Sequence, residues 1–310
     1  TTITRNIGID FGFFKERLSG TIDVYWNTVK DLLVPSDIPG YTGYTKLMTN
    51  VGQTSNRGIE LQLNAWLIET KDFSLNATFN IGHNKNKIDK LASGEKEWIL
   101  TSAWRNDVVN SDDYRAYVGG TSGLIYGYVN DGFYTVADFE SFDSKSRTWK
   151  LKEGVVTVDG VSPRPGDIKY QNLRDDGSST NRIDTGDGTF DNPGDRKIIG
   201  NNSLRLQYGI NLGVNYKGFD LSVLLQGVGK RDVWISDARR WPFNSGQFGS
   251  LFKDQLDYWK PVDSANGDWT AANPNAEYFR IYGQGNNSGY NTRAQTKYLM
   301  NGSYLRVKNV

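Results

Sequence analysis

The chain has 310 residues, enough for one large domain or two ordinary ones. Gly (34), Tyr (17), Phe (14) and Trp (9) are abundant, and this mixture favours β structure. Lys and Arg (36) balance Asp and Glu (35), so the charge gives no reason to expect nucleic-acid binding, and the absence of Cys excludes disulfides and thiolate chemistry.

Hydropathy alone does not decide between a soluble and a membrane protein. No stretch approaches the roughly 20 apolar residues of a transmembrane helix, and the mean hydropathy is −0.58. Barrel strands, however, alternate lipid-facing and lumen-facing residues and therefore keep a low mean hydropathy. Residues 1–4 show no signal-peptide pattern, so we expect either a chain that has lost its leader or an internal fragment.

Strict period-two alternation of apolar and polar residues predicts seven β-strands. The apolar sets of the first four are Ile7, Ile9, Phe11 and Phe13; Leu18, Ile22, Val24 and Trp26; Ile59, Leu61, Leu63, Ala65 and Leu67; and Phe73, Leu75, Ala77, Phe79 and Ile81. The pattern resumes with Leu204, Leu206, Tyr208, Ile210, Leu212, Val214 and Tyr216, then with Phe219, Leu221, Val223 and Leu225, and a seventh strand is expected near Tyr304. At about 12 residues, such strands exceed those of ordinary sheets and suit tilted membrane strands.

The connections between the predicted strands alternate between short and long. Tight turns are expected at residues 15–16, 69–71 and 217–218, and long loops at about 30–55, 85–202 and 232–301. Outer-membrane barrels have this rhythm, with short periplasmic turns and long extracellular loops. We therefore predict an all-β fold, in which residues 1–310 form part of one transmembrane antiparallel β-barrel. A soluble β-sandwich is the alternative, since alternation also marks its inner and outer faces.

Several segments resemble the SusC/RagA family of TonB-linked outer-membrane transporters of Bacteroidetes. They are residues 6–11 (NIGIDF), 39–43 (PGYTG), 50–52 (NVG), 56–60 (NRGIE), 165–170 (PGDIKY), 195–200 (DRKIIG), 218–222 (GFDLS), 225–227 (LQG) and 302–310 (GSYLRVKNV). The resemblance lies in the order and spacing of these segments over nearly the whole chain. It implies a barrel of about 22 strands around an N-terminal plug, of which this chain is the middle and later part without the plug.

The resemblance also implies a function and partners. A complete member imports a large nutrient, a glycan or an oligopeptide, across the bacterial outer membrane. It is driven by the TonB–ExbB–ExbD system through the plug region, is embedded in outer-membrane lipid, and lies beneath a SusD-like surface lipoprotein. Two alternatives stay open: a siderophore or cobalamin TonB-dependent receptor, and a soluble cell-surface β-sandwich that binds carbohydrate.

An acidic segment after residue 172 resembles the Asp-rich loop of the family and, in part, an EF-hand calcium loop. Asp176, Asp184 and Asp187 are the candidate calcium ligands, because Ca²⁺ takes six to eight oxygens. Asn172 and Arg174 depart from the pattern, since they occupy its first and third ligand positions. The other interpretation is an acidic surface turn, in which Asp and Gly serve the turn geometry. No other cofactor is expected.

Catalysis is not expected. The carboxylate pairs at residues 112–113 and 175–176 lie in turn-like sequence without an accompanying nucleophile and base, and His83 is interpreted as a polar rim residue.

Aromatic residues are frequent in the long loops. The candidates for contact with substrate or partner are Trp98, Trp104, Tyr126, Tyr128, Trp234, Trp241, Phe243 and Trp269. Flat rings bind sugars and apolar side chains at low entropic cost, but loops of this length also need a small core of their own. Three interpretations therefore remain for these rings: substrate contact, partner contact and internal packing. Trp26, Trp66, Tyr208 and Tyr216, near strand ends, are expected in the interfacial aromatic girdles.

Overall fold

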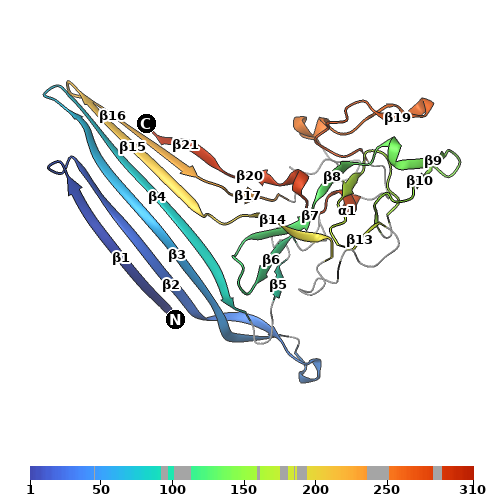
Figure 1. Cartoon of the computed structure of the whole chain (residues 1–310), viewed down its shortest axis with the longest axis horizontal. Helices are drawn as coiled ribbons and strands as arrows, with labels where there is room; N and C mark the ends of the chain where they lie inside the picture. Colours follow the sequence, from blue (N-terminus) through green and yellow to red (C-terminus); the bar gives the residue numbers. More distant parts are fainter. Residues whose placement is uncertain are drawn as a thin grey trace.

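Seven antiparallel strands form one continuous sheet in the computed structural model (Figure 1). The strands are β1 (Thr2–Phe13), β2 (Leu18–Asp37), β3 (Lys46–Glu69), β4 (Phe73–Lys90), β15 (Leu206–Tyr216), β16 (Phe219–Val228) and β21 (Tyr304–Asn309), and they lie side by side in this order. The structure describes residues 1–44, 46–91, 97–100, 113–158, 161–174, 181–184, 186, 194–235, 251–281 and 288–310. All seven strands predicted from the alternation are confirmed.

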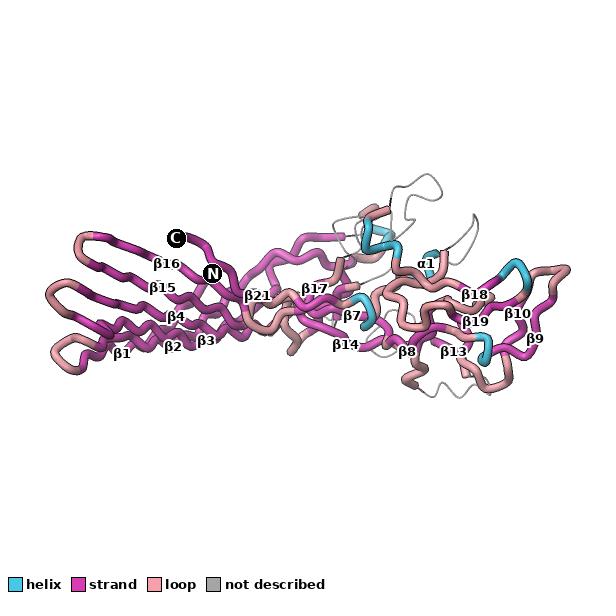
Figure 2. The backbone as a smooth tube through the Cα atoms, turned by 90° about the horizontal axis from the view of Figure 1, so that it is seen from above, coloured by secondary structure: helices cyan, strands magenta, loops and turns pink. Residues whose placement is uncertain are grey.

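The three tight turns also lie where the sequence predicts them, together at one end of the sheet (Figure 2). Lys217 and Gly218 join β15 to β16, and both have positive φ, 48° and 88°. Two central residues with positive φ make a type I′ turn, whose twist matches that of the flanking strands. Tyr216 and Phe219 therefore pair directly across the turn.

The loop predicted at residues 30–55 is wrong in its extent. β2 continues to Asp37 and β3 begins at Lys46, so that residues 38–45 make the connection, with a short 3-10 helix at Gly40–Thr42. Register shifts lie between Val29 and Leu32 and between Leu32 and Leu33. These irregularities break the period-two pattern without ending the strands. β4 likewise runs to Lys90, beyond the start of the loop predicted from residue 85.

The register sorts the side chains of the sheet onto two faces. Ile210 pairs with Phe79 and Leu225, whereas Asn211 pairs with Thr78 and Leu224. The polar side chains line a groove along the sheet. Some of them pack over glycines of the neighbouring strand; a Cβ at Gly209, for example, would lie 2.7 Å from Asn80 Oδ1. The opposite face leaves large apolar side chains uncovered.

The two long connections fold together into a separate loop domain beyond the other end of the sheet (Figures 1 and 2). A four-stranded sheet contains β5 (Glu97–Leu100), β6 (Tyr114–Tyr117), β7 (Leu124–Tyr128) and β14 (Arg196–Asn201). Strand pairs surround it: β8 (Asn130–Phe133) with β12 (Ile168–Tyr170), β9 (Phe139–Asp143) with β10 (Thr148–Leu151), β11 (Thr157–Val158) with β13 (Arg182–Ile183), β17 (Asp232–Val233) with β20 (Met300–Asn301), and β18 (Pro261–Asp263) with β19 (Asp268–Ala271).

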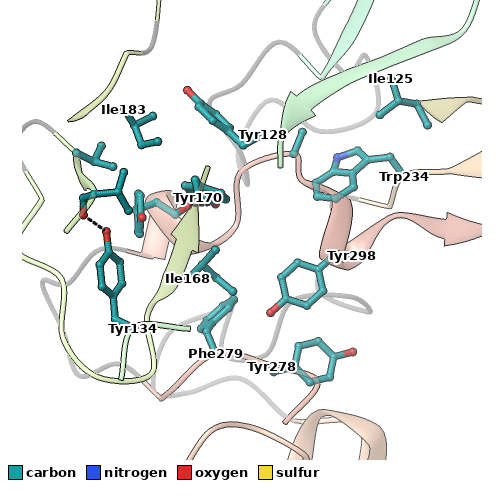
Figure 3. Packing of buried hydrophobic residues seen from close by; sticks show 14 of the residues in the cluster. Ile125, Tyr128, Tyr134, Ile168, Tyr170, Ile183, Trp234, Tyr278, Phe279 and Tyr298 are labelled. Atoms are coloured by element: carbon teal, nitrogen blue, oxygen red, sulfur yellow. Dashed lines mark hydrogen bonds between the residues drawn. The ribbon is translucent and has the colours of Figure 1, made fainter. Parts of the chain in front are cut away.

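The buried hydrophobic core lies in this loop domain rather than against the large sheet (Figure 3). It contains Ile125, Tyr128, Tyr134, Phe139, Val156, Val158, Ile168, Tyr170, Ile183, Trp234, Tyr278, Phe279, Tyr290, Ala294 and Tyr298. In the part of the chain that the structure describes, no helix has the length and apolar character needed to cross a bilayer.

Candidate functional site

The groove on the polar face of the large sheet is the first candidate surface. Its volume is about 560 Å³, and its lining includes Asp23, Glu60, Gln62, Gln207 and Lys308. Acidic side chains come from β2 and β3 on one side, and the basic side chain comes from β21 on the other. The groove therefore presents hydrogen-bonding groups of both charges to whatever occupies it.

Cross-strand hydrogen bonds organise this polar face. Thr21 Oγ1 donates to Asp10 Oδ1 at 2.7 Å, and the Tyr25 hydroxyl donates to Asn84 Oδ1 at 3.3 Å. At the β16–β21 edge, Arg306 and Lys308 both donate to Gln226 Oε1, at 3.0 and 3.2 Å. Amide and hydroxyl groups predominate among these contacts. Such a surface suits a hydrated solute or a polar segment of polypeptide.

The second candidate surface is the loop domain, and a buried ion pair holds its two loops together. Asp167, which is fully buried, accepts from Arg280 Nε at 2.8 Å and from Asn291 Nδ2 at 3.3 Å. Its other carboxylate oxygen accepts from the backbone N–H of Arg164 at 2.9 Å. A buried carboxylate is tolerated when it is paired and hydrogen-bonded in this way. The 165–170 segment is thus the junction between two loops that are far apart in sequence.

Buried tyrosines continue this junction (Figure 3). The Tyr170 hydroxyl donates to the backbone oxygen of Tyr290 at 2.7 Å and accepts from Gln295 Nε2 at 3.0 Å. The Tyr134 hydroxyl donates to the backbone oxygen of Val156 at 2.7 Å. Burial raises the pKa of both phenols, so they stay neutral hydrogen-bond donors. Their role here is to join loop segments.

Close backbone approach fixes the same junction at two glycines. A Cβ at Gly166, whose φ is 88°, would overlap the ring of Trp259. A Cβ at Gly127 would overlap the backbone of Ala294, which accepts a hydrogen bond from the backbone N–H of Tyr128 at 2.8 Å. Only glycine fits where two chain segments come this near.

Three of the aromatic candidates belong to the interior of the loop domain. Tyr126, Tyr128 and Trp234 are only 1%, 5% and 6% exposed. The guanidinium groups of Arg115 and Arg196 lie 4.4 and 4.8 Å from the centre of the Tyr126 ring. These contacts match the internal-packing interpretation for the three rings. Trp98 lies in β5, but the structure does not describe its side chain. Trp104, Trp241 and Phe243 lie outside the described residues.

Trp269 belongs to a different, partly open group of rings. It packs against Phe142 and Trp149, with ring centres 6.0 and 5.8 Å away. Phe142 and Trp149 in turn lie 4.8 Å apart, and Phe142 is 37% exposed. The three rings come from the hairpins β9–β10 and β18–β19, at the end of the loop domain remote from the sheet (Figure 1). We call Phe142, Trp149 and Trp269 the distal aromatic patch.

Of the three candidate calcium ligands, the structure describes one. Asp184 accepts from the backbone N–H of Gly186 at 2.7 Å, as in a local turn. Its own backbone N–H donates to Asp195 Oδ2 at 2.6 Å, and Asp195 Oδ1 accepts from the backbone N–H of Leu173 at 2.7 Å. Asp176 and Asp187 lie outside the described residues. Within the described ranges, no three His, Cys, Asp or Glu side chains gather as a metal site.

The predicted girdle residues divide between the two faces. Tyr208 and Tyr216 follow the apolar register, and Trp26 pairs with Arg5 and Arg57 on the same face. Trp66 instead pairs with Asn76, whose side chain lies on the polar face over Gly213. The girdle prediction is therefore wrong for Trp66. A register shift after Trp66 restores the apolar face at Ile68 and Leu75.

The comparison with known proteins agrees with this architecture. Residues 1–152 match the family described as TonB dependent receptor-like, beta-barrel. TonB-dependent receptor P3 of Formosa agariphila is 28% identical over 98% of this chain and 26% of its own length. TonB-dependent receptor SusC of Bacteroides thetaiotaomicron is 43% identical over 30% of this chain and 10% of its own length. The chain is therefore similar to TonB-dependent receptors of the SusC/RagA type.

Solved structures show the same fold. The structure of the RagAB peptide transporter superimposes with a TM-score of 0.60 at 20% identity, covering 99% of this chain and 28% of that chain. This chain thus spans about a quarter of the length of the full-length relatives it matches. It forms part of a bacterial outer-membrane β-barrel, and the relatives it resembles are named receptors rather than enzymes. The uncovered apolar face of the large sheet is its lipid face, so the sandwich alternative is wrong.

Sequence reasoning missed the residues that join the two loops. Asp167, Arg280, Asn291 and Gln295 gave no periodic signal, because their partners lie more than a hundred positions away. The 165–170 motif gave the only sequence hint of this junction, since it places Gly166 and Asp167 directly before the short strand Ile168–Tyr170. Its role became visible only with the second loop beside it.

Proposed function

We propose that this chain forms part of the wall and the extracellular loops of a transporter that imports a large polar nutrient across the outer membrane. The observation that carries the proposal is the pairing of two surfaces: a polar groove on the inner face of a lipid-facing sheet, and a loop domain folded beyond one end of it. A barrel wall with a polar lumen passes hydrated solutes.

A glycan or an oligopeptide is the solute class that we propose. Amides, hydroxyls and charges of both signs in the groove favour a solute with many hydrogen-bonding groups, which sugars and peptides share. Among the relatives, RagAB is named a peptide importer. A siderophore or cobalamin is the competing class.

For partners, we propose a SusD-like surface lipoprotein over the loop domain and the TonB–ExbB–ExbD system acting through a plug. The distal aromatic patch supports a protein contact over the loops, because partly exposed aromatic rings are typical anchors of interfaces. A calcium ion at Asp176, Asp184 and Asp187 also remains a proposal, and binding of ⁴⁵Ca²⁺ by the full-length receptor, compared with an Asp184→Asn variant, is its test.

Deletion of the gene followed by complementation tests the proposed transport. The deletion strain should fail to grow on the imported glycan or oligopeptide as sole nutrient, and the full-length receptor should restore growth. Normal growth of the deletion strain on every glycan and peptide tested, together with lost uptake of an iron chelate or cobalamin, would instead establish the competing class.

The orientation has its own test, because the chain contains no Cys. A Lys145→Cys substitution, in the exposed β9–β10 turn of the loop domain, should react with an impermeant maleimide on intact cells. A Lys217→Cys substitution in the β15–β16 turn should react only after the outer membrane is opened. The reverse pattern would overturn the proposed extracellular position of the loops.

A further inference from the structure

The lipid face of the sheet changes its chemistry sharply at one row of residues. Ile7, Val24 and Ile59 pair across β1, β2 and β3 and form an apolar row. The next row toward the loop domain crosses four strands and consists of Arg5, Trp26, Arg57 and Lys85, each paired directly with its neighbour. We call these four residues the basic row.

The extent of the apolar surface places this row at the edge of the hydrocarbon. From Leu206 to Tyr216 the apolar residues of β15 extend about 34 Å along the strand. A tilt of about 35–45° reduces this to a height of about 24–28 Å, close to the roughly 25 Å apolar band of such barrels. Leu206 pairs with His83, one row below Lys85. Trp26, 41% exposed, lies within the row, as interfacial aromatics do.

The cations of the basic row have no ion-pair partner among the residues that the structure describes. Arg5, Arg57 and Lys85 are exposed, and among the described residues none of the three takes part in an ion pair. The nearby acidic residues Asp23 and Glu60 lie three positions closer to the tight turns and line the polar groove on the other face.

Two of these cations also face each other. Arg57 and Lys85 are a direct cross-strand pair, and like charges in such a pair repel. Lys87, two residues further along β4, has Asp89 at 3.7 Å and is partly neutralised. An anion between Arg57 and Lys85 would therefore remove a repulsion that no described residue compensates.

At the opposite end of the apolar surface, the seven described strands carry no comparable row. The tight turns there mix the two signs, with Lys15 beside Glu16 and Lys71 beside Asp72. If both ends of the apolar surface simply faced water, there would be no reason for cations to gather at one end and for mixed charges to occur at the other. The asymmetry points to a negatively charged layer at the loop end.

We propose that the basic row binds the phosphate-bearing headgroup of an anionic lipid of the outer leaflet. A guanidinium group can donate two parallel hydrogen bonds to two phosphate oxygens, and Trp26 packs beside the headgroup at the interface. The inference rests on the proposed orientation, in which the loop end faces outward. The row would hold one edge of the barrel in contact with a specific class of lipid.

Lipid binding by the full-length receptor tests this proposal. The receptor is reconstituted into phosphatidylcholine nanodiscs containing lipid A, delipidated mildly, and examined for retained lipid A by native mass spectrometry. The double variant Arg57→Gln/Lys85→Gln should retain about tenfold less, because two charge-assisted contacts are lost. The matched control Lys15→Gln/Lys71→Gln, which removes two exposed lysines at the turn end, should retain as much as the unmodified receptor.

The outcomes separate this inference from the proposed transport. Equal retention by both variants overturns the lipid site, even where nutrient import is intact. Displacement of lipid A by equimolar inorganic phosphate would show a general phosphate site and would also overturn it. Arg57→Lys should recover part of the retention lost in Arg57→Gln, since it restores the charge without the planar fork. Failed import with intact, Arg57-dependent retention contradicts the transport proposal alone.

Discussion

The large sheet and the loop domain place their hydrophobic residues in opposite ways. In the sheet, Ile7 and Ile9 are 64% and 63% exposed, whereas Tyr170 and Tyr298 in the loop domain are fully buried. The sheet has lipid as the solvent of one face, so its apolar side chains need no protein partner. The loop domain lies in water and must bury its own core. The two regions thus differ because their surroundings differ: the sheet, with one face in lipid, has alternating apolar residues, and the loop domain, in water, has a buried cluster of tyrosines.

The largest expected effect on this contrast comes from the ion pair in the loop domain. Arg280→Ala leaves the buried Asp167 carboxylate without its cation, which should cost the loop domain about 3–5 kcal/mol. Hydrogen exchange should accelerate across residues 161–174 while the sheet stays protected. Lys150→Ala, which removes an exposed pair with Glu140 (2.6 Å), is the control and should cost less than about 1 kcal/mol. Equal hydrogen-exchange rates in the two variants would show that the Asp167–Arg280 ion pair is not the main contribution to the stability of the loop domain.

The lipid side of the contrast is tested by two adjacent positions of β15. Ile210→Arg puts a charge on the lipid face and should cost about 2–4 kcal/mol at mid-depth. Asn211→Arg puts the same side chain into the polar lumen and should cost far less. Reversible urea unfolding of the full-length receptor in lipid vesicles measures both. Similar losses at the two positions would mean that neither face is lipid.

The sequence predicts the large sheet well because each of its strands has one face in lipid. The alternation of residues 206–216 or 73–81 is a local property, and lipid enforces it residue by residue. It fails beyond Val29, where register shifts displace the pattern and the loop at 30–55 was predicted in place of strand. It breaks again after Trp66, where another register shift lies. The core of the loop domain depends on contacts such as Tyr170 with Tyr290, which no local pattern encodes.

A single hydroxyl provides the next, smaller test. Tyr170→Phe keeps the ring but removes the group that donates to the Tyr290 carbonyl and accepts from Gln295, leaving two buried polar groups without that partner. The expected cost to the loop domain is about 1–3 kcal/mol. Tyr41→Phe is the control, since Tyr41 is 91% exposed. Thermal unfolding followed by the near-ultraviolet circular dichroism of the aromatic rings compares them. Identical midpoints would contradict a stabilising role for this hydroxyl.

The smallest effect concerns a turn, where neither lipid nor core packing decides. Gly218→Ala forces a side chain onto a residue with φ of 88°, in a turn with open space around it, so backbone strain alone should cost about 1–2 kcal/mol. Gly40→Ala, also in open space but without a positive φ, should be close to neutral. The measurement is the urea midpoint of the receptor in vesicles. A shift at Gly40 as large as that at Gly218 would show that loss of glycine flexibility, and not the left-handed backbone of the turn, sets the cost.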